Sequence, residues 1–243
     1  MLLHDDVVDE SKMRRGRKTV NAEWGNSPSV LVGDFLHSRA FEMMVEIGDM
    51  QVMQILSGAT NVIAEGEVQQ LCSVRNPNTT ESEYLEIITR KTAKLFQAAA
   101  HSGAILAAAD EQTEVALRDY GLHLGISFQL VDDLLDYKGD EATLGKNVGD
   151  DLAEGKVTLP VIDAMRHCSK EDRAFICNAI TSGGVENLPK MLALAKTTGA
   201  LAYTAKLANS ERCRAIDCLT MVADSPYKSA MNSLVNFVVD RQN

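Results

Sequence analysis

The sequence is poor in several features that mark common classes of protein. Lysine and arginine number 24 against 34 aspartates and glutamates, and the net charge of −10 argues against a nucleic-acid partner held by a basic surface. The five cysteines never occur in C-x-x-C spacing, so we expect neither a disulfide framework nor a zinc site. No apolar run approaches the roughly 20 residues that span a bilayer, so no transmembrane segment is expected.

The cysteines also bear on the cellular compartment. They are odd in number and scattered along the chain, which predicts reduced, buried thiols of a cytoplasmic protein. They are Cys72, Cys168, Cys177, Cys213 and Cys218. The N-terminal segment is acidic and lacks the apolar core of a signal peptide. A cytoplasmic location is therefore expected.

Aromatic residues are few as well, at 5%, whereas helix-forming residues are abundant and apolar residues recur at spacings of three and four. After the loop "RNPNTT", a capping box from Thr80 to Glu83 is expected to begin a long helix. One stripe of that helix is predicted to comprise Leu85, Ile88, Thr92, Leu95, Phe96 and Ala99. The pattern predicts an all-α protein.

A second long helix is predicted from Glu114 to Tyr137. Gly121 and Gly125 lie inside it, at a cost of about 1 kcal/mol each, which indicates close packing against a neighbour. We find no linker, low-complexity tract or fixed-period repeat. The expected organisation is a single all-helical domain over residues 1–243, a bundle around a central cavity.

Two copies of the pattern D-D-x-x-D lie far apart in the chain. The first, in "LLHDDVVDESKMRRGRK", comprises Asp5, Asp6 and Asp9, and the second, in "FQLVDDLLDYKGD", comprises Asp132, Asp133 and Asp136. On a helix the first and third aspartates share a face, while the middle one points about 100° round the axis. Like charges at this spacing destabilise a helix by a few tenths of a kcal/mol, so a bound cation is expected.

The donors define the expected metal. Carboxylate oxygens without histidine or cysteine suit Mg²⁺, with Mn²⁺ as the alternative. Two solvated acidic helix faces are the other interpretation. Apolar residues flank both motifs and make that interpretation less favourable.

A basic segment, "MRRGRK", follows the first motif. Arginines just after metal-binding carboxylates suit a diphosphate, because guanidinium grips phosphate oxygens through several donors. A nucleic-acid or nuclear-localisation patch is the other interpretation, and the net charge disfavours it. Gly16 is expected to end the first helix.

These motifs resemble those of trans-isoprenyl (polyprenyl) diphosphate synthases. The resemblance extends through "VLVGDFLHSRAF", "EGEVQQL", "RKTAKLF" and "LGKNVGDDLAEGKVTLP", and covers at least residues 1–165. It is strongest to the bacterial long-chain branch that makes octaprenyl diphosphate for the ubiquinone side chain. The resemblance implies an isoprenoid synthase bundle, a homodimer, and condensation of isopentenyl diphosphate onto an allylic diphosphate such as farnesyl diphosphate. It also implies a product of about C40.

The resemblance also implies roles for individual residues. Asp5 and Asp9 would hold two Mg²⁺ ions and Asp132 a third, with further carboxylates as ligands or support, namely Asp6, Asp133 and Asp136. The allylic diphosphate would be contacted by Arg14, Lys91, Lys146 and Lys156. Arg15 would contact isopentenyl diphosphate, and Thr92 and Gln129 would line the reacting end. Taken singly, Thr92, Gln129 and Lys146 also fit ordinary structural roles.

Several alternatives stay open from the sequence. A shorter-chain farnesyl or geranylgeranyl synthase, an inactive fragment and a non-catalytic subunit of a heteromeric synthase share much of this pattern. A class I terpene cyclase would carry an N-D-x-x-S-x-x-x-E second motif, and a di-iron bundle would carry Glu-x-x-His pairs. Neither pattern is found.

Two further features complete the sequence-based expectations. The segment "EGEVQQL" is either one polar helix face or a support for the site or for a dimer interface. The resemblance further implies helices before the first motif, with a G-K-x-x-R segment and a histidine for isopentenyl diphosphate, which this sequence does not contain.

Overall fold

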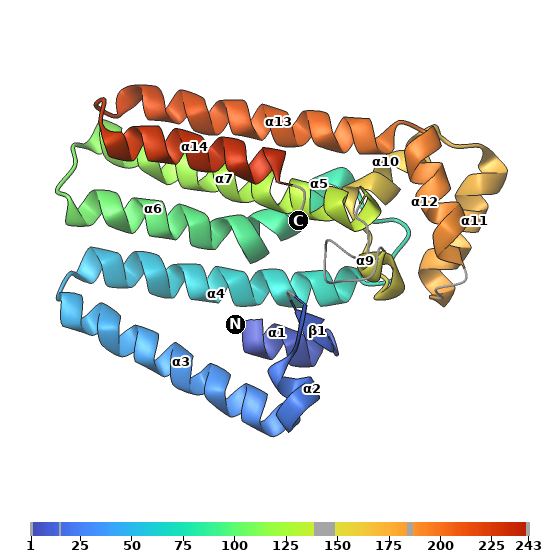
Figure 1. The fold of residues 1–243 in the computed structure, drawn as a ribbon, viewed down its shortest axis with the longest axis horizontal. Helices are drawn as coiled ribbons and strands as arrows, with labels where there is room; N and C mark the ends of the chain where they lie inside the picture. Colours follow the sequence, from blue (N-terminus) through green and yellow to red (C-terminus); the bar gives the residue numbers. More distant parts are fainter. Residues whose placement is uncertain (1, 15, 139–148, 184–186, 242–243) are drawn as a thin grey trace.

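The computed structural model describes residues 2–14, 16–138, 149–183 and 187–241 (Figure 1). The elements are α1 (Leu2–Val8), β1 (Met13–Arg14), β2 (Arg17–Lys18), α2 (Val20–Trp24), α3 (Asn26–Ile47), α4 (Met50–Ser73), α5 (Glu81–Ile88), the π-helical turn η1 (Thr89–Ala93), α6 (Lys94–Leu106), α7 (Glu111–Lys138), α9 (Asp150–Ala153), α10 (Leu159–His167), α11 (Lys170–Ser182), α12 (Leu188–Thr197), α13 (Ala200–Cys218), the 3₁₀ turn η3 (Leu219–Met221) and α14 (Pro226–Asp240).

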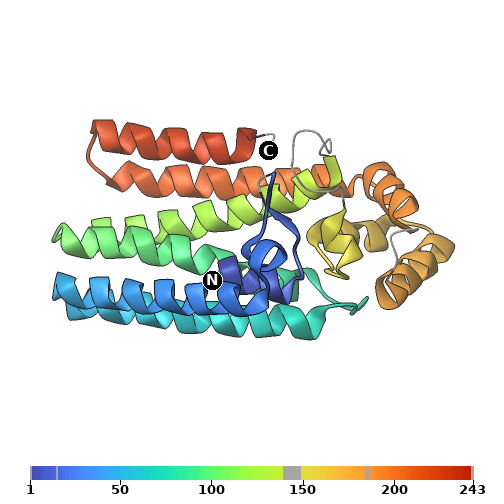
Figure 2. The same ribbon diagram turned by 60° about the horizontal axis from the view of Figure 1, so that its bottom comes forward.

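The long helices run side by side in successive tiers. Helices α13 and α14 form the first tier, α7 and α6 the next, and α4 and α3 the last (Figures 1 and 2). The short α1 and the β1–β2 hairpin lie beside α4, while α10, α11 and α12 gather at one end. The predicted all-α fold is confirmed.

Helix α7 joins the two hydrophobic clusters of the core. Its C-terminal half contributes Leu130 and Leu134 to the larger cluster, which includes residues of α5, α10, α11, α12 and α13. Its N-terminal half contributes Tyr120 and Leu124 to a smaller cluster with α13 and α14. The predicted helix Glu114–Tyr137 therefore exists, slightly longer than expected, as the element that carries the second aspartate motif into the core.

The glycines of α7 lie where neighbouring backbone comes close. A Cβ atom built on Gly121 would lie 2.5 Å from the carbonyl oxygen of Phe96, and one built on Gly125 would lie 2.5 Å from the Cα of Ala93. Both distances are shorter than van der Waals contact, so no side chain fits without displacing the backbone. The predicted close packing is confirmed.

The helix predicted from Glu81 onward is interrupted by the π turn η1. A π turn inserts one residue, which rotates all later residues around the axis. The stripe predicted from regular spacing therefore fails at Leu95, which is 52% exposed, and at Ala99, which is exposed too, while Ala93 and Ala98 are buried instead. Phe96 of the predicted stripe does pack against the core. The residues of the turn, "TRKTA", include two predicted site residues.

The start of α5 confirms the predicted capping box. The Thr80 hydroxyl accepts a bond from the Glu83 amide at 3.3 Å, and the Glu83 carboxylate accepts one from the Thr80 amide at 2.7 Å. These bonds satisfy two amides that the helix itself leaves without partners.

Replacing Thr80 with alanine is expected to lower the free energy of unfolding by about 1 kcal/mol, because the cap of α5 is lost. Urea titration followed by circular dichroism measures the change. Thr181→Ala provides a control, since that exposed hydroxyl only bonds the carbonyl of Cys177 within its own helix. Equal losses in the two variants would contradict the role of the cap.

The basic segment is not helical, which corrects the expectation for Gly16. Helix α1 ends at Val8, and the chain then forms a small antiparallel hairpin in which Arg14 pairs with Arg17. Gly16 has a φ of 72° and lies in the turn of that hairpin. The physical reason is local: a two-residue turn favours glycine at positive φ as strongly as a helix end does.

The cysteines differ in exposure, and the helices are too short or too polar to cross a membrane in the described part of the chain. All five cysteines are unpaired, but Cys72 and Cys213 are exposed, so the expectation of burial is wrong for these two. Among the described helices, none combines the length and apolar character needed to cross a bilayer.

Candidate functional site

The first aspartate motif places one carboxylate inward and two toward the site. Asp6 is only 3% exposed, whereas Asp5 is half-buried. Asp9 follows α1 directly, and its amide bonds the carbonyl of Asp5 at 2.8 Å, which keeps the helical spacing. Burial raises the pKa of Asp5, Glu67 and Asp9 raise it further, and Lys91 lowers it. Asp5 thus lies in a crowded negative environment.

Asp6 holds Arg14 of the hairpin. The Nε and Nη2 atoms of Arg14 donate to the same carboxylate oxygen of Asp6, at 2.9 and 2.7 Å. Because this oxygen already accepts two bonds, the geometry favours the supporting role for Asp6 over that of a metal ligand. The pair fixes the guanidinium beside the first motif.

Lys91 projects from the π turn onto α4. Its amine lies 2.8 Å from the Glu67 carboxylate and donates to the Gln70 side chain at 2.5 Å. Gly66 directly precedes Glu67, and a Cβ there would come within 2.7 Å of the Lys91 amide nitrogen. The segment "EGEVQQL", for which support of the site was one of the two expectations, therefore packs against the π turn and contacts Lys91 through Glu67 and Gln70.

Lys156 connects the first motif to the loop after α9. Its amine lies 3.3 Å from Asp9 and 2.5 Å from Glu154. Burial lowers the pKa of Lys156, but the neighbouring carboxylates outweigh that effect and raise it overall. These carboxylates are Asp151, Glu154 and Asp9. Lys156 is consequently a fixed positive charge within an acidic group of residues.

The second motif divides its carboxylates between the surface and the core. The side chain of Asp132 is 49% exposed and lies 3.4 Å from Nη2 of Arg241, which also stacks on the Phe128 ring. Asp133 is 2% exposed. Asp136 accepts a bond from the backbone amide of Gly149 at 3.2 Å. No local pattern predicts Arg241 as a neighbour of Asp132, because the two residues lie 109 positions apart in the chain.

Asp133 has protein partners on both oxygens. Tyr84 donates to one at 2.5 Å and Gln129 to the other at 2.8 Å. Burial raises the pKa of Asp133, and so does Asp151, while the two hydrogen bonds lower it; the net direction is upward. Burial also holds the pKa of the Tyr84 hydroxyl well above its ordinary value, so this group remains a donor.

Thr92 of η1 and Gln129 of α7 are hydrogen-bonded to each other. The Thr92 hydroxyl donates to the side-chain oxygen of Gln129 at 2.9 Å. The structure thus brings together two residues that are 37 positions apart and that the sequence predicted for the reacting end. Both are only partly buried.

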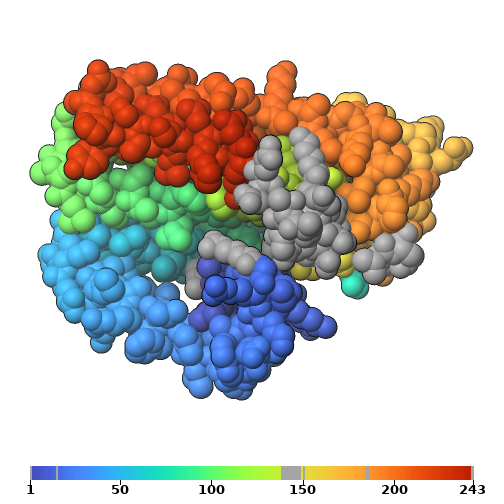
Figure 3. Space-filling view, in the orientation of Figure 1, coloured from blue at the N-terminus to red at the C-terminus, as the bar shows by residue number. Residues whose placement is uncertain are grey.

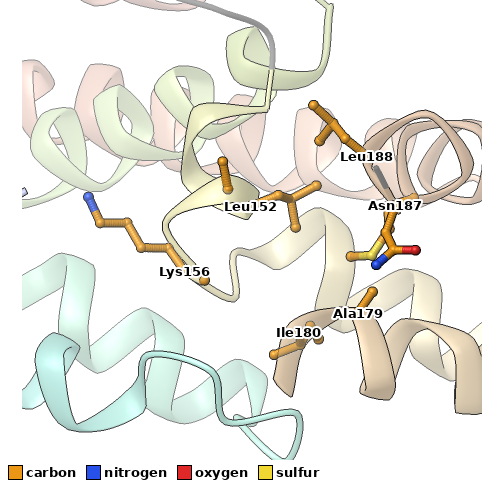
Figure 4. Close-up of a pocket in the computed structure, with 9 residues that line it drawn as sticks. Leu152, Lys156, Ala179, Ile180, Asn187 and Leu188 are labelled. Carbon is orange, nitrogen blue, oxygen red and sulfur yellow. The ribbon is translucent and has the colours of Figure 1, made fainter. Parts of the chain in front are cut away.

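The surface is recessed between the N-terminal segment and helices α6 and α14 (Figure 3). A separate hollow lies on the far side of Lys156, among Leu152, Ile180 and Leu188 (Figure 4). The aliphatic stem of Lys156 lines this hollow, but its amine points away from it. The apolar lining does not suit a diphosphate, so the hollow is not the diphosphate site.

Two predicted residues, Arg15 and Lys146, lie outside the described part of the chain. Several of the others are linked: the charge of Lys91 acts on Asp5, Lys156 lies 3.3 Å from Asp9, and Gln129 bonds both Thr92 and Asp133. In the described ranges, no three histidine, cysteine or carboxylate side chains already converge on one point. The donors that face the site are hard carboxylate oxygens, which fit a magnesium ion that keeps water or phosphate oxygens as further ligands.

Comparison with known proteins gives a consistent result. A family model described as Polyprenyl synthetase matches residues 1–195. The octaprenyl diphosphate synthase of Haemophilus influenzae is 50% identical over 241 residues, which are 99% of this chain and 73% of that protein. The all-trans-nonaprenyl-diphosphate synthase of Rhodobacter capsulatus is 47% identical over 99% of this chain and 74% of that protein. The chain therefore spans about three quarters of the length of these relatives.

Solved structures agree with the sequence comparison. The polyprenyl synthase of Caulobacter crescentus, crystallised with calcium and isoprenyl diphosphate, superposes with a TM-score of 0.95 at 45% identity, covering 100% of this chain and 74% of the other. The match extends over the whole bundle and includes both aspartate motifs. This chain belongs to the polyprenyl synthetase family.

Proposed function

We propose that this chain condenses isopentenyl diphosphate head-to-tail (1′–4) onto an allylic diphosphate and makes a long-chain all-trans polyprenyl diphosphate. The observations that carry the proposal are the contact of Lys156 with Asp9 of the first motif and the bonds of Gln129 to Asp133 of the second motif and to Thr92, which follows Lys91. The site thereby combines carboxylates and lysines, which suit a reaction that releases a diphosphate anion, with neutral oxygens, which suit the cation that forms.

Asp5, Asp9 and Asp132 are the proposed magnesium ligands. When bound, Mg²⁺ ions would supply positive charge that stabilises the diphosphate as it leaves. The carboxylates gather negative charge that two lysines only partly balance, which supports a role for further cations. The calcium and isoprenyl diphosphate named for the Caulobacter structure support the same class of site.

The protein's own side chains would act on each stage of the reaction. Lys91, Lys156 and Arg14 are proposed to bind diphosphate oxygens, so that the allylic C–O bond breaks with its electron pair going to the diphosphate. The oxygens of Thr92 and Gln129 would stabilise the allylic cation. The double bond of isopentenyl diphosphate then forms the new C–C bond, and the proton lost passes to the released diphosphate. Apolar walls would exclude water, which otherwise captures the cation.

The relatives support a long product. Octaprenyl and nonaprenyl synthases are 50% and 47% identical to this chain, whereas a geranylgeranyl diphosphate synthase from Methanosarcina mazei is 35% identical. We therefore propose a product near octaprenyl length and retain the shorter-chain synthase as the second candidate. By resemblance, Lys146 would also contact the allylic diphosphate and Arg15 isopentenyl diphosphate.

Mg²⁺ and pyrophosphate are expected to bind together far more tightly than either binds alone. The carboxylates repel a free diphosphate, and Mg²⁺ retains enough open coordination positions to bridge the two. Isothermal calorimetry with pyrophosphate, in Mg²⁺ and in EDTA, measures the difference. Equal affinity in EDTA would exclude the proposed metal site.

Arg14→Lys is expected to raise the KM for the allylic diphosphate about tenfold, because one amine replaces the several donors that Asp6 holds in place. Steady-state kinetics with farnesyl diphosphate as the varied substrate measures it. Arg17→Lys is the matched control, since the exposed Arg17 lies across the same hairpin. An unchanged KM in Arg14→Lys would refute the assignment.

Three further expectations form part of the proposal. A homodimer is supported by the outer helix α3, where Leu31 and Phe35 are 66% and 65% exposed, because large apolar patches mark interfaces.

A single domain is supported by α7, which contributes to both hydrophobic clusters. A cytoplasmic location is supported by the five unpaired cysteines.

A further inference from the structure

A chain of hydrogen bonds runs from the core to the reacting end of the site. It begins at the Tyr84 hydroxyl, passes through the Asp133 carboxylate and the Gln129 amide, and ends at the Thr92 hydroxyl, with successive distances of 2.5, 2.8 and 2.9 Å. The four residues come from α5, α7 and η1. Tyr84 and Asp133 are 4% and 2% exposed, so water does not compete for these bonds.

The donors and acceptors in this chain fix the orientation of the amide. Both oxygens of Asp133 accept hydrogen bonds, one from the Tyr84 hydroxyl and the other from the Gln129 amide nitrogen, so that nitrogen faces Asp133. The amide oxygen then faces Thr92, whose hydroxyl proton is used in that bond and whose remaining lone pairs stay available. Without Asp133, the amide could rotate by half a turn and present its nitrogen instead.

This orientation matters for a reaction that passes through a cation. An amide oxygen carries partial negative charge and stabilises a nearby positive centre, whereas the amide N–H groups repel it. The position of Asp133 follows from the helical period: it points about 100° away from Asp132, into the core rather than toward the solvent-facing site.

We propose that Asp133 and Tyr84 are positioning residues that hold the Gln129 amide with its oxygen toward the allylic cation. This inference rests on the proposed role of Gln129 at the reacting end. It separates the second motif into Asp132, which faces the metal and diphosphate, and Asp133, which acts through Gln129. Tyr84 is assigned a function for which the sequence pattern gave no indication.

The test uses geranylamine, which is protonated at neutral pH, as a probe of cation binding in the presence of Mg²⁺ and pyrophosphate. Calorimetry on the whole chain is expected to show affinity reduced about tenfold or more in Asp133→Asn, and about threefold in Tyr84→Phe. Pyrophosphate binding in Mg²⁺ should change less than about twofold in both. Turnover should show the same split, with a lower kcat at an unchanged KM for the allylic diphosphate.

Tyr84→Phe removes one hydroxyl and leaves the Asp133 side chain in place, so a loss of affinity there is not an effect of a missing carboxyl group. It also keeps the test valid if Asp133→Asn does not fold. Tyr120→Phe is the matched control, because this tyrosine is 3% exposed and its hydroxyl bonds the Met231 carbonyl at 3.1 Å, away from the site. Wild-type affinity for geranylamine is expected in that variant.

Three results would overturn the inference or its basis. Wild-type geranylamine affinity in a folded Tyr84→Phe variant would exclude the positioning role. An equal loss of pyrophosphate binding in Asp133→Asn would make Asp133 a metal ligand instead. Unchanged affinity in Gln129→Leu would refute the proposed role of Gln129 itself, whereas a loss there with no loss in Asp133→Asn would refute only the positioning role.

Discussion

Asp5→Asn is expected to abolish Mg²⁺-dependent pyrophosphate binding and to lower turnover by about a thousandfold or more, while raising the thermal stability of the protein in EDTA. The functional loss follows because an amide is a poor ligand for a hard cation and carries no charge to balance one. The gain in stability follows from burial, which makes the ionised form of Asp5 unfavourable in the folded state.

The expected gain in stability of Asp5→Asn depends on pH, and the direction of that dependence follows from the pKa of Asp5. The pKa of Asp5 is raised by burial and then by Glu67, above its ordinary value of 3.8. The folded protein therefore binds this proton more tightly than the unfolded chain, and stability contributed by Asp5 falls as pH rises from about 3.8 through the folded pKa. Asparagine removes this loss, so the stability difference between variant and wild type should grow over that window.

Thermal melts from pH 4 upward in EDTA, paired with calorimetry in Mg²⁺, measure both effects. Asp119→Asn serves as the control, because Asp119 is also a partly exposed helical aspartate but pairs with Arg118 outside the site. It should bind Mg²⁺ and pyrophosphate normally and gain no stability. An Asp5→Asn protein that binds pyrophosphate as the wild type does would remove Asp5 from the metal site.

Gly125→Ala is expected to destabilise the protein by about 2–4 kcal/mol, although alanine is the better helix former. The added methyl group would lie 2.5 Å from the Cα of Ala93, so α7 and the π turn must separate. The separation would also disturb Thr92, which neighbours Ala93. Turnover should therefore fall together with stability.

Gly103→Ala is the matched control for this variant. Gly103 lies in α6, and a Cβ atom there would meet no other atom within 4 Å. The same substitution is expected to stabilise the protein by about 0.5–1 kcal/mol, because only helix propensity changes. Urea unfolding should therefore show a lower free energy of unfolding for Gly125→Ala and a higher one for Gly103→Ala. A stabilised Gly125→Ala variant would contradict the close packing of α7 against η1.

The sequence predicted the parts of the fold that depend on local chemistry. The capping box at Thr80 and the helix around Gly121 and Gly125 are confirmed, because caps and helical periodicity are encoded in neighbouring residues. The π turn at Thr89–Ala93 was not predicted, since it reflects packing against other helices rather than its own residues. The predicted stripe consequently failed at Leu95.

The candidate site divides in the same way. The two aspartate motifs stand out in the sequence by charge and spacing, whereas Lys91 and Lys156 were expected only through the family resemblance. The structure pairs Lys156 with Asp9 and Lys91 with Glu67. The partnership of Tyr84 with Asp133 spans 49 residues, and that of Arg241 with Asp132 spans 109. No local pattern signals either pair, because both depend on how distant helices pack.

Product analysis tests the central claim of long-chain condensation most directly. The chain would be incubated with labelled isopentenyl diphosphate, farnesyl diphosphate and Mg²⁺, and the products separated by reversed-phase chromatography. The account predicts labelled products that form only with Mg²⁺ and centre near octaprenyl length. A dominant geranylgeranyl-length product would contradict the long-chain assignment, and equal product in EDTA, or none in either condition, would contradict the proposed activity.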